Sequence, residues 1–271
     1  MKKVSVVIPF FSRIYVDLDK TIQSVFEQDY KNIQVIIVDD FSPILAEDCI
    51  KKYANSTNLK VVRNTVNLGG GLSRNIGVEH ADGELVAFLD HDDYWYSYKI
   101  SKQIQLYNQL DDHSLVVIYS QCKIISENES FIMPMKAIPN NRSISDYLFN
   151  DRGLIQTSGI LLDKSLALKV PFDDLKRHQD YQFCLSLESF GAKFFMVEEP
   201  LYDFIQTPKL NDYSFSMFWL DKYKHFFTEN ATFSFKQDVI LRSMISHHKH
   251  YKCAFIYAFE NKMLSTFAKY F

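Results

Sequence analysis

The chain has 271 residues, of which 47% are hydrophobic, and its formal net charge at neutral pH is −3. This length and composition suit one large α/β domain or a domain with an appendage, and the nearly balanced charge argues against a nucleic-acid partner. The charge is unevenly spread, because residues 209–271 hold nine Lys/Arg and five Asp/Glu, a net charge of +4, which leaves −7 for residues 1–208.

Strands and helices alternate along the first 90 residues. Short apolar or β-branched runs predict strands, and apolar residues at helical spacing predict helices. The predicted strands are residues 4–8, 33–38, 59–63 and 84–89, and the predicted helices are residues 17–29, 45–55 and 72–81. This alternation implies right-handed crossovers and a mostly parallel central sheet flanked by helices, an α/β fold.

The second half of the chain is less regular. Helices are predicted over residues 97–110 and 180–187, and strands over residues 115–119, 159–162 and 193–197. The segment 213–271 is rich in aromatic residues and is predicted to be helical. We therefore expect an α/β domain over residues 1–208 and a small helical, basic and aromatic region over residues 209–271.

Three carboxylates follow the fourth predicted strand within four residues. They are Asp90, Asp92 and Asp93, with His91 among them. A short apolar run before such a cluster is typical of a buried parallel strand whose carboxyl end opens onto solvent, where open α/β sheets bind ligands. Carboxylate oxygens suit Mg²⁺ or Mn²⁺, and Mg²⁺ is usually held by one or two carboxylates together with substrate phosphates. A solvated acidic turn without function is the alternative.

Asp39 and Asp40 follow the second predicted strand in the same way. Because parallel strands end at one edge of a sheet, both acidic clusters are expected to converge on one ligand. The first pair would contact a nucleobase or ribose, and the second cluster would hold a metal on a diphosphate. A helix N-cap or an Asx turn would also explain the first pair.

The segment Asn67-Leu68-Gly69-Gly70-Gly71 precedes the predicted helix 72–81. It indicates backbone that passes close to a ligand at a helix N-terminus, although a flexible loop would look the same. The glycine spacing of a dinucleotide fingerprint is missing, which disfavours a Rossmann dehydrogenase.

Four segments, in their order and spacing, resemble the family 2 glycosyltransferases of the GT-A fold. They are Val4 to Pro9, Val38-Asp39-Asp40-x-Ser42, Asn67-x-Gly69 with Arg74-Asn75-x-Gly77, and Phe88-Leu89-Asp90-x-Asp92-Asp93. The resemblance covers roughly residues 3–205. It implies a GT-A-like sheet, a nucleotide-diphosphate-sugar donor, a divalent metal (Mn²⁺ or Mg²⁺) and inversion at the anomeric carbon.

The resemblance also implies roles for individual residues. Asp40 would contact uracil, and Asp90 and Asp92 form the D-x-D element, with Asp92 or the adjoining Asp93 as the direct metal ligand. The residues expected to bind the nucleotide sugar are Pro9, Phe11, Asp39, Asp40, Asn67, Gly69, Arg74, Asp90, His91 and Asp92.

A later segment matches the place where family members carry a Glu-Asp pair at the start of a helix. Here it reads Arg177-His178-Gln179-Asp180-Tyr181. The resemblance implies that Asp180 is the catalytic base and that Arg177, His178 and Gln179 lie near the acceptor. The alternatives are a capping or salt-bridged surface role for Asp180 and a structural role for His178. Two departures stand out, Gln179 in place of the usual Glu and Pro9-Phe10-Phe11-Ser12 in place of Pro-x-Tyr-Asn.

The same segment resembles a subgroup of bacterial polysaccharide and lipopolysaccharide transferases. This implies transfer of a hexosyl unit from a UDP-sugar to a glycan acceptor linked to undecaprenyl diphosphate, in O-antigen or capsule synthesis. Two rival classes stay open. A sugar-1-phosphate nucleotidyltransferase would need a glycine-rich, basic loop after the first strand, which Pro9 to Arg13 does not supply. A non-catalytic nucleotide-sugar-binding protein would not need a base at Asp180.

Basic and aromatic residues interleave along residues 222–227, 247–252 and 262–271. Such a surface is typical of peripheral association with an anionic membrane, and a helical region with its aromatic side chains packed inward is the alternative. No signal peptide or membrane span is predicted, and the four scattered cysteines predict reduced thiols. We therefore expect a cytoplasmic protein. If this surface binds lipid, the protein would lie on the inner face of the cytoplasmic membrane.

Overall fold

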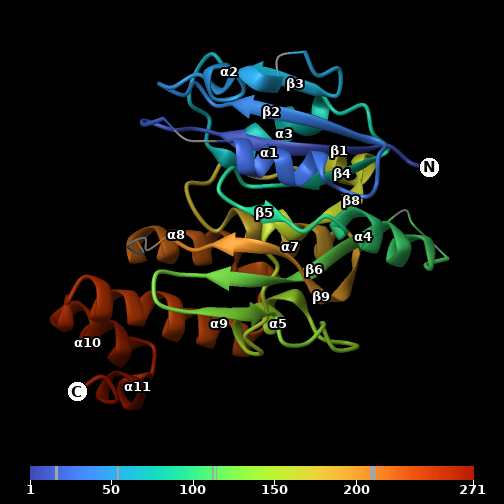
Figure 1. Ribbon diagram of the computed structural model, residues 1–271. Helices are drawn as coiled ribbons and strands as arrows, with labels where there is room; N and C mark the ends of the chain where they lie inside the picture. Colours follow the sequence, from blue (N-terminus) through green and yellow to red (C-terminus); the bar gives the residue numbers. More distant parts are fainter. Residues whose placement is uncertain (16–17, 54, 112, 114, 208–211) are drawn as a thin grey trace. The chain divides into compact units, whose positions relative to one another are not determined.

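The computed structural model describes residues 1–15, 18–53, 55–111, 113, 115–207 and 212–271. The chain forms two compact units (Figure 1). The sheet unit comprises Met1–Ile138 and Leu154–Gln206, and the helical unit comprises Pro139–Gly153 and Thr207–Phe271. The boundary that the sequence placed after residue 208 lies outside the described residues. The segment Pro139–Gly153, which the sequence analysis kept in the α/β domain, is part of the helical unit.

The sheet unit is built on one nine-stranded sheet of order β3-β2-β1-β4-β8-β6-β9-β5, with β7 paired to β6. Its strands are β1 (Val4–Phe10), β2 (Ile33–Asp39), β3 (Leu59–Arg63), β4 (Leu85–Phe88), β5 (Tyr94–Trp95), β6 (Val116–Ile125), β7 (Ser130–Met133), β8 (Leu161–Asp163) and β9 (Lys193–Ile205). Neighbours are parallel from β3 to β4 and between β6 and β9, whereas β5, β7 and β8 pair antiparallel. The mixed, mostly parallel sheet expected from the alternating pattern is therefore confirmed.

Helices flank this sheet (Figure 1). They are α1 (Asp19–Phe26), α2 (Ala46–Cys49), α3 (Gly70–Glu79), α4 (Lys99–Asn108), α6 (Lys164–Lys169) and α7 (Gln179–Ser189). The strands β1 and β2 are buried at every position, because helices cover a parallel sheet and its central strands need apolar side chains on both faces.

Several predicted elements differ in extent from the structure. The predicted helix 45–55 consists of α2 and a 3₁₀ turn at Lys51–Tyr53, and its residue 54 lies outside the described residues, as does residue 17 of the predicted helix 17–29. The predicted strand 159–162 begins later, because Thr157–Gly159 form a 3₁₀ turn. The strands β5 and β7 were not predicted; β5 has only two residues and β7 has four.

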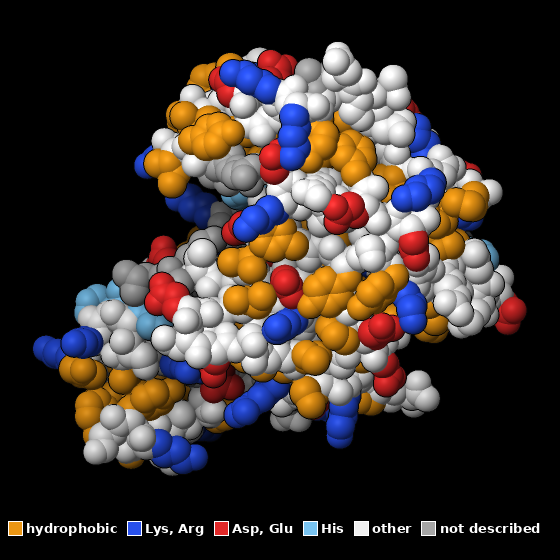
Figure 2. All heavy atoms as spheres, viewed as in Figure 1, with side chains coloured by type: hydrophobic (Ala, Val, Ile, Leu, Met, Phe, Trp, Pro, Cys, Tyr) orange, Lys and Arg blue, Asp and Glu red, His pale blue; other side chains and the backbone are white. Residues whose placement is uncertain are grey.

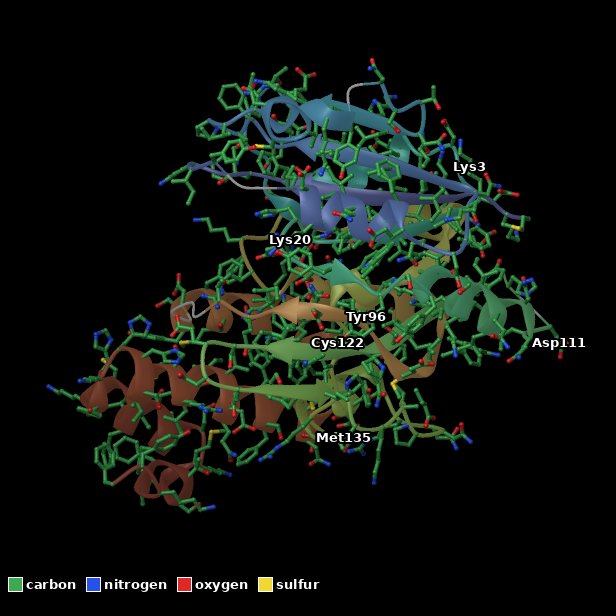
Figure 3. The ribbon with its side chains drawn as sticks, in the orientation of Figure 1. Lys3, Lys20, Tyr96, Asp111, Cys122 and Met135 are labelled. Atoms are coloured by element: carbon green, nitrogen blue, oxygen red, sulfur yellow. The ribbon has the colours of Figure 1, made fainter. Side chains whose placement is uncertain are left out.

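Polar side chains also tie the sheet together. The hydroxyl of Tyr96, just after β5, donates to Asp203 of β9 at 2.6 Å. Cys122 of β6 is buried in the same sheet, and Figure 3 labels both Tyr96 and Cys122. All four cysteines are free, as predicted.

The helical unit packs around aromatic side chains. Its helices are α5 (Ile144–Phe149), α8 (Tyr213–Tyr223), α9 (Glu229–Phe235), α10 (Tyr251–Glu260) and α11 (Leu264–Ala268), with π-helical turns at Lys236–Leu241 and Ser243–His247. Trp219 and Phe235 are fully buried with ring centroids 5.3 Å apart, and Phe149 of α5 stacks on Phe227 at 5.0 Å. Among the described residues, no helix is long and apolar enough to cross a bilayer.

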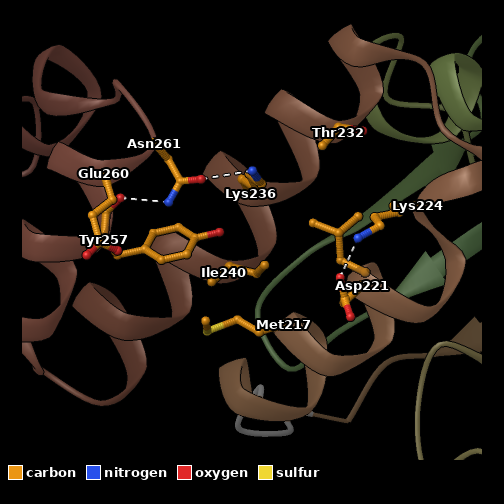
Figure 4. A pocket seen from close by; sticks show the side chains of 10 residues that line it. Met217, Asp221, Lys224, Thr232, Lys236, Ile240, Tyr257, Glu260 and Asn261 are labelled. Atoms are coloured by element: carbon orange, nitrogen blue, oxygen red, sulfur yellow. Dashed lines mark hydrogen bonds and ion pairs between the residues drawn. The ribbon is translucent and has the colours of Figure 1, made fainter.

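A pocket of about 360 Å³ lies within the helical unit (Figure 4). Lys224 pairs with Asp221 at 2.7 Å, and Lys236 donates to Asn261 at 2.8 Å. The Tyr257 ring points into the pocket, and its hydroxyl is buried without a hydrogen-bond partner in the described part of the chain. No residue that the sequence singled out for donor, metal or acceptor binding lines this pocket.

Candidate active site

The acidic cluster after β4 is held by the segment Gln156 to Ser158. The backbone amide of Asp90 donates to the Ser158 hydroxyl at 2.9 Å, and that hydroxyl donates to Asp93 Oδ2 at 2.6 Å. The Gln156 amide group donates to both Asp90 Oδ2 (3.0 Å) and Asp93 Oδ2 (3.1 Å). A neutral side chain thus separates two carboxylates that would otherwise repel each other.

Asp93 is fully buried. Its second oxygen accepts the backbone N–H of Ile205 at 2.9 Å. Burial raises the pKa of Asp93 well above its ordinary value, and the charge of Asp90 raises it further. The carboxylate that the sequence offered as a direct metal ligand therefore faces the interior, where Gln156, Ser158 and Ile205 satisfy it.

Asp92 differs from its two neighbours. It is half-buried, and its carboxylate forms no hydrogen bond or ion pair with any other described residue. No group of three His, Cys, Asp or Glu side chains in the described ranges could hold a metal ion. The residues fit a divalent metal of the kind that takes one protein carboxylate and completes its shell with substrate phosphate oxygens and water.

Arg74 of α3 connects Asp90 with α7. The Arg74 side chain is buried; it donates through Nη2 to Asp90 Oδ1 and through Nη1 to Gln179 Oε1 at 2.9 Å. Its guanidinium lies 5.5 Å from the ring centroid of Phe172. Asn75 holds the Phe172 backbone through two hydrogen bonds of 2.8 and 2.9 Å. Adjacent residues of one helix thus position both the acidic cluster and the segment that leads to α7.

The glycine-rich segment fixes the start of α3. Gly69 precedes the helix with a φ of 83°, a conformation that favours glycine. At Gly71 a Cβ atom would lie 2.9 Å from the carbonyl oxygen of Asp173, so a side chain there would push the 172–179 segment away. The loop is therefore a close-packing site, and flexibility does not explain its glycines.

Asp180 lies in the first turn of α7 beside this network. Burial raises its pKa from 3.8 to about 6, the charge of Arg74 opposes this rise, and the charge of Asp90 adds to it. A backbone hydrogen bond from Thr157 also lowers the pKa, and the Thr157 hydroxyl lies 3.5 Å from Asp90 Oδ2. Asp90 and Asp180, 90 positions apart, thus share Arg74 and Thr157. A half-buried carboxylate with a pKa near 6 is suited to accept a proton at neutral pH.

The first acidic pair organises the loops after β2. Asp39 accepts the backbone N–H groups of Ser42 (2.8 Å) and Ala46 (3.0 Å) and pairs with Arg63 at 2.6 Å. Ala46 is the first residue of α2, so Asp39 supports both the turn after β2 and the start of this helix.

Asp40 is buried and holds the segment that opens α3. Its carboxylate accepts hydrogen bonds from the Leu68 and Gly69 backbone amides (2.8 and 2.7 Å) and from the Asn64 side chain (2.8 Å). Asn67 donates to the Asp40 carbonyl at 3.1 Å. A carboxylate offers about four acceptor positions, and described residues use three of those of Asp40. Both acidic strand ends thus contact α3: Asp40 binds the backbone at the start of this helix, and Asp90 pairs with its residue Arg74.

The other predicted donor-site residues lie near the ends of β1 and β4. Pro9 is buried within β1 and pairs with Val38, and Phe11 is half-buried just after this strand. The His91 ring meets Phe10 edge-on, with ring centroids 5.6 Å apart.

Arg177 and His178 directly precede α7. His178 adopts a left-handed backbone (φ 60°) and stacks on Tyr181 with ring centroids 5.4 Å apart. Burial lowers its pKa to about 4, and the charge of Arg177 contributes. The imidazole is therefore neutral at physiological pH.

Sequence reasoning missed part of this site. It assigned no contacts to Gln156, Thr157 and Ser158, whereas these residues hold Asp90, Asp93 and Asp180. It also missed the buried Lys99, which donates to Gln103 at 2.6 Å, while Gln103 donates to the Gly159 carbonyl at 2.7 Å and so supports the same turn. The only indication of these contacts in the sequence was the run of polar residues 156–158 before the apolar strand β8.

Comparison with known proteins identifies the class. The profile of glycosyl transferase family 2 matches residues 5–169. The chain is 32% identical over 283 aligned residues to the amylovoran biosynthesis glycosyltransferase AmsB of Erwinia amylovora, covering 98% of this chain and 89% of AmsB. It is 31% identical to the Escherichia coli UDP-Glc:α-D-GlcNAc-diphosphoundecaprenol β-1,3-glucosyltransferase WfaP, over 64% of this chain and 65% of WfaP.

The fold is shared with a solved structure. S. aureus TarS 1–349, crystallised with UDP-GlcNAc, superposes with a TM-score of 0.67 over 90% of this chain and 73% of that one, at 19% identity. The chain belongs to glycosyl transferase family 2. It is a glycosyltransferase with a GT-A-type sheet, which confirms the resemblance seen in the sequence.

Proposed function

We propose that this glycosyltransferase moves a hexosyl unit from a UDP-sugar to a lipid-linked glycan acceptor in bacterial surface polysaccharide synthesis, with inversion at the anomeric carbon. The names of its relatives support donor and acceptor, since WfaP is named for a UDP-Glc donor and a diphosphoundecaprenol-linked acceptor, and AmsB for amylovoran biosynthesis. The observation that carries the mechanism is the half-buried carboxylate of Asp180, with a pKa of about 6, beside the Asp90–Arg74–Gln179 network.

Asp180 is the general base of this proposal. The acceptor hydroxyl oxygen attacks the anomeric carbon, the bond from that carbon to the diphosphate oxygen breaks, and Asp180 takes the hydroxyl proton. Above about pH 6 the carboxylate is ionised and can accept this proton, and such a base typically contributes about 10²- to 10⁴-fold in rate. Arg74 and the Thr157 amide keep the pKa of Asp180 from rising further.

Asp92 is the metal ligand of this proposal, because it alone of the three carboxylates after β4 is not engaged by other described side chains. A bound Mn²⁺ or Mg²⁺ neutralises charge that develops on the leaving diphosphate. Asp90 and Asp93 keep the turn that carries Asp92 in shape.

The loops after β1 and β2 bind the nucleoside of this proposal. The open acceptor position of Asp40 takes the imide N–H of uracil, and Asn67 and Gly69 lie in the loop that Asp40 fixes. Arg177 and His178, ahead of α7, flank the acceptor beside Asp180.

The test is a donor and acceptor assay with matched acid-to-amide variants. UDP-Glc, UDP-Gal and UDP-GlcNAc are offered with Mn²⁺ and a GlcNAc-diphosphoryl polyprenol, and released UDP is measured. We expect Asp180→Asn to lower transfer about 10²- to 10⁴-fold while UDP still binds, and Asp92→Asn to weaken metal-dependent UDP binding. Asp111→Asn, at an exposed residue labelled in Figure 3, is the control and should transfer normally.

Each part of the proposal can fail separately. Wild-type transfer rates in Asp180→Asn would remove the base assignment, and unchanged metal dependence in Asp92→Asn would remove the ligand assignment. If no UDP-sugar binds in the presence of metal, the donor class is wrong.

A further inference from the structure

One face of α10 exposes large apolar side chains. Tyr251, Phe255 and Phe259 recur every four residues and are 44%, 50% and 66% exposed, and Ile256 beside them is 47% exposed. Residues spaced by four lie on one side of a helix. The opposite side of α10 is buried in the helical unit through Ala254, Tyr257 and Ala258.

The segment around α11 extends this surface. The Phe267 ring lies 5.6 Å from Phe255 and 5.1 Å from Phe271, and Phe271 lies 5.3 Å from Tyr251. We call the resulting surface the aromatic face, composed of Tyr251, Phe255, Ile256, Phe259, Phe267 and Phe271. Figure 2 shows hydrophobic side chains gathered over α10 and α11, at lower left, with basic side chains around them.

The charge around the aromatic face is strongly positive. Residues 242–271 hold five Lys/Arg and one acidic residue, a net charge of +4. Lys249, Lys252, Lys262 and Lys269 are exposed, and none of them forms an ion pair with another described residue. Lys252 lies within the exposed arc of α10 itself.

We propose that the aromatic face lies on the surface of a bilayer that contains anionic phospholipid. A helix with an apolar face and flanking lysines inserts its apolar side chains at the boundary of headgroups and acyl chains, while the lysines meet lipid phosphates. A protein partner fits less well, because lysine is depleted in protein interfaces, and a second copy would bring a like charge of +4 against this one. The inference is independent of the transfer chemistry.

The experiment is vesicle co-sedimentation of the full chain without substrate. Phosphatidylcholine vesicles with and without phosphatidylglycerol are compared, and we expect binding only where the anionic lipid is present. The double variant Phe255→Ser/Phe259→Ser should lower the partition coefficient by about tenfold or more. Lys252→Gln/Lys262→Gln should lower it about fivefold per charge at low salt, and less as salt increases.

The matched control is Phe190→Ser, which removes a phenylalanine that is 47% exposed in the sheet unit. It should bind vesicles like the wild type. Equal binding to both vesicle types, or wild-type binding by both double variants, would overturn the proposal. So would sedimentation equilibrium that shows a wild-type dimer which the phenylalanine double variant dissociates, since a second copy would then cover the face. Because no sugar donor is present, failure here leaves the proposed transfer reaction untouched.

Discussion

Replacing Asp180 by asparagine is expected to stabilise the fold while it removes transfer activity. The pKa of Asp180 is raised from 3.8 to about 6, and one pKa unit corresponds to about 1.4 kcal/mol. The ionised carboxylate therefore lowers the free energy of unfolding by at most about 3 kcal/mol. Because the side chain is only half-buried, solvent screens part of this cost, and we expect a gain of roughly 1–2 kcal/mol for Asp180→Asn.

The pH dependence follows from the direction of the shift. The pKa is higher in the folded state, so the folded protein binds the proton more tightly than the unfolded chain between about pH 4 and pH 6. Above about pH 6 the carboxylate is ionised in both states and the penalty is complete. Below about pH 4 it is protonated in both states and the penalty disappears. The advantage of the asparagine variant should therefore be largest at neutral pH and shrink toward zero near pH 4.

Urea unfolding of wild type, Asp180→Asn and the control Asp111→Asn at several pH values measures this difference. A variant that is less stable than the wild type at neutral pH would refute the reasoning. It would mean that the carboxylate caps α7 or pairs with Arg74 to hold the fold together, the structural alternative that the sequence left open.

Three further substitutions test the surroundings. Gln179→Glu adds a negative charge beside Arg74, at the residue that precedes Asp180. It should raise the pKa of Asp180 and shift the acidic limb of the profile of kcat/KM against pH to higher pH; an unchanged limb would contradict this. Lys99→Met should stabilise the fold by about 1–3 kcal/mol at neutral pH, because burial lowers the pKa of Lys99. The unfolded wild-type chain then binds more protons than the folded one, so wild-type stability should rise with pH. The difference between the urea midpoints of variant and wild type should therefore narrow toward about pH 10. Tyr257→Phe removes a buried hydroxyl without a partner in the described residues and should raise the thermal midpoint by an amount equivalent to about 1 kcal/mol; a lower midpoint would indicate that water or a ligand satisfies it.

The first four strands and the helices between them could be predicted from the sequence, because strands buried on both faces leave continuous apolar runs. The two-residue strand β5 could not, since its pairing depends on Tyr202 and Asp203 of β9, more than 100 positions away. The helix predicted over 45–55 was too long, because apolar spacing does not distinguish an α-helix from the short helix Ala46–Cys49 followed by a 3₁₀ turn at Lys51–Tyr53.

The acidic clusters after β2 and β4 could be recognised in the sequence, but the contacts of their individual carboxylates could not. Asp90, Asp92 and Asp93 look alike in sequence, and only contacts with Gln156 and Ser158 make Asp93 interior and leave Asp92 open. Those partners lie more than 60 positions away. The Arg74–Gln179 contact spans 105 positions. The sequence alone therefore does not show that Gln179, where the family pattern has glutamate, contacts an arginine of α3.

The helical unit is discontinuous along the chain, because Pro139–Gly153 belongs to it although Leu154–Gln206 returns to the sheet. Thr228, which directly precedes α9, donates to Asp146 of α5 at 2.6 Å, and Phe149 of α5 packs on both Phe227 and Phe235. A shortened protein that stops near residue 206 would therefore strip α5 of its partners and leave its apolar side chains in water. A chimera that exchanges the helical unit between relatives has to carry both segments. A chimera cut at the C-terminal junction alone should misfold or aggregate, whereas one that carries both segments should stay folded.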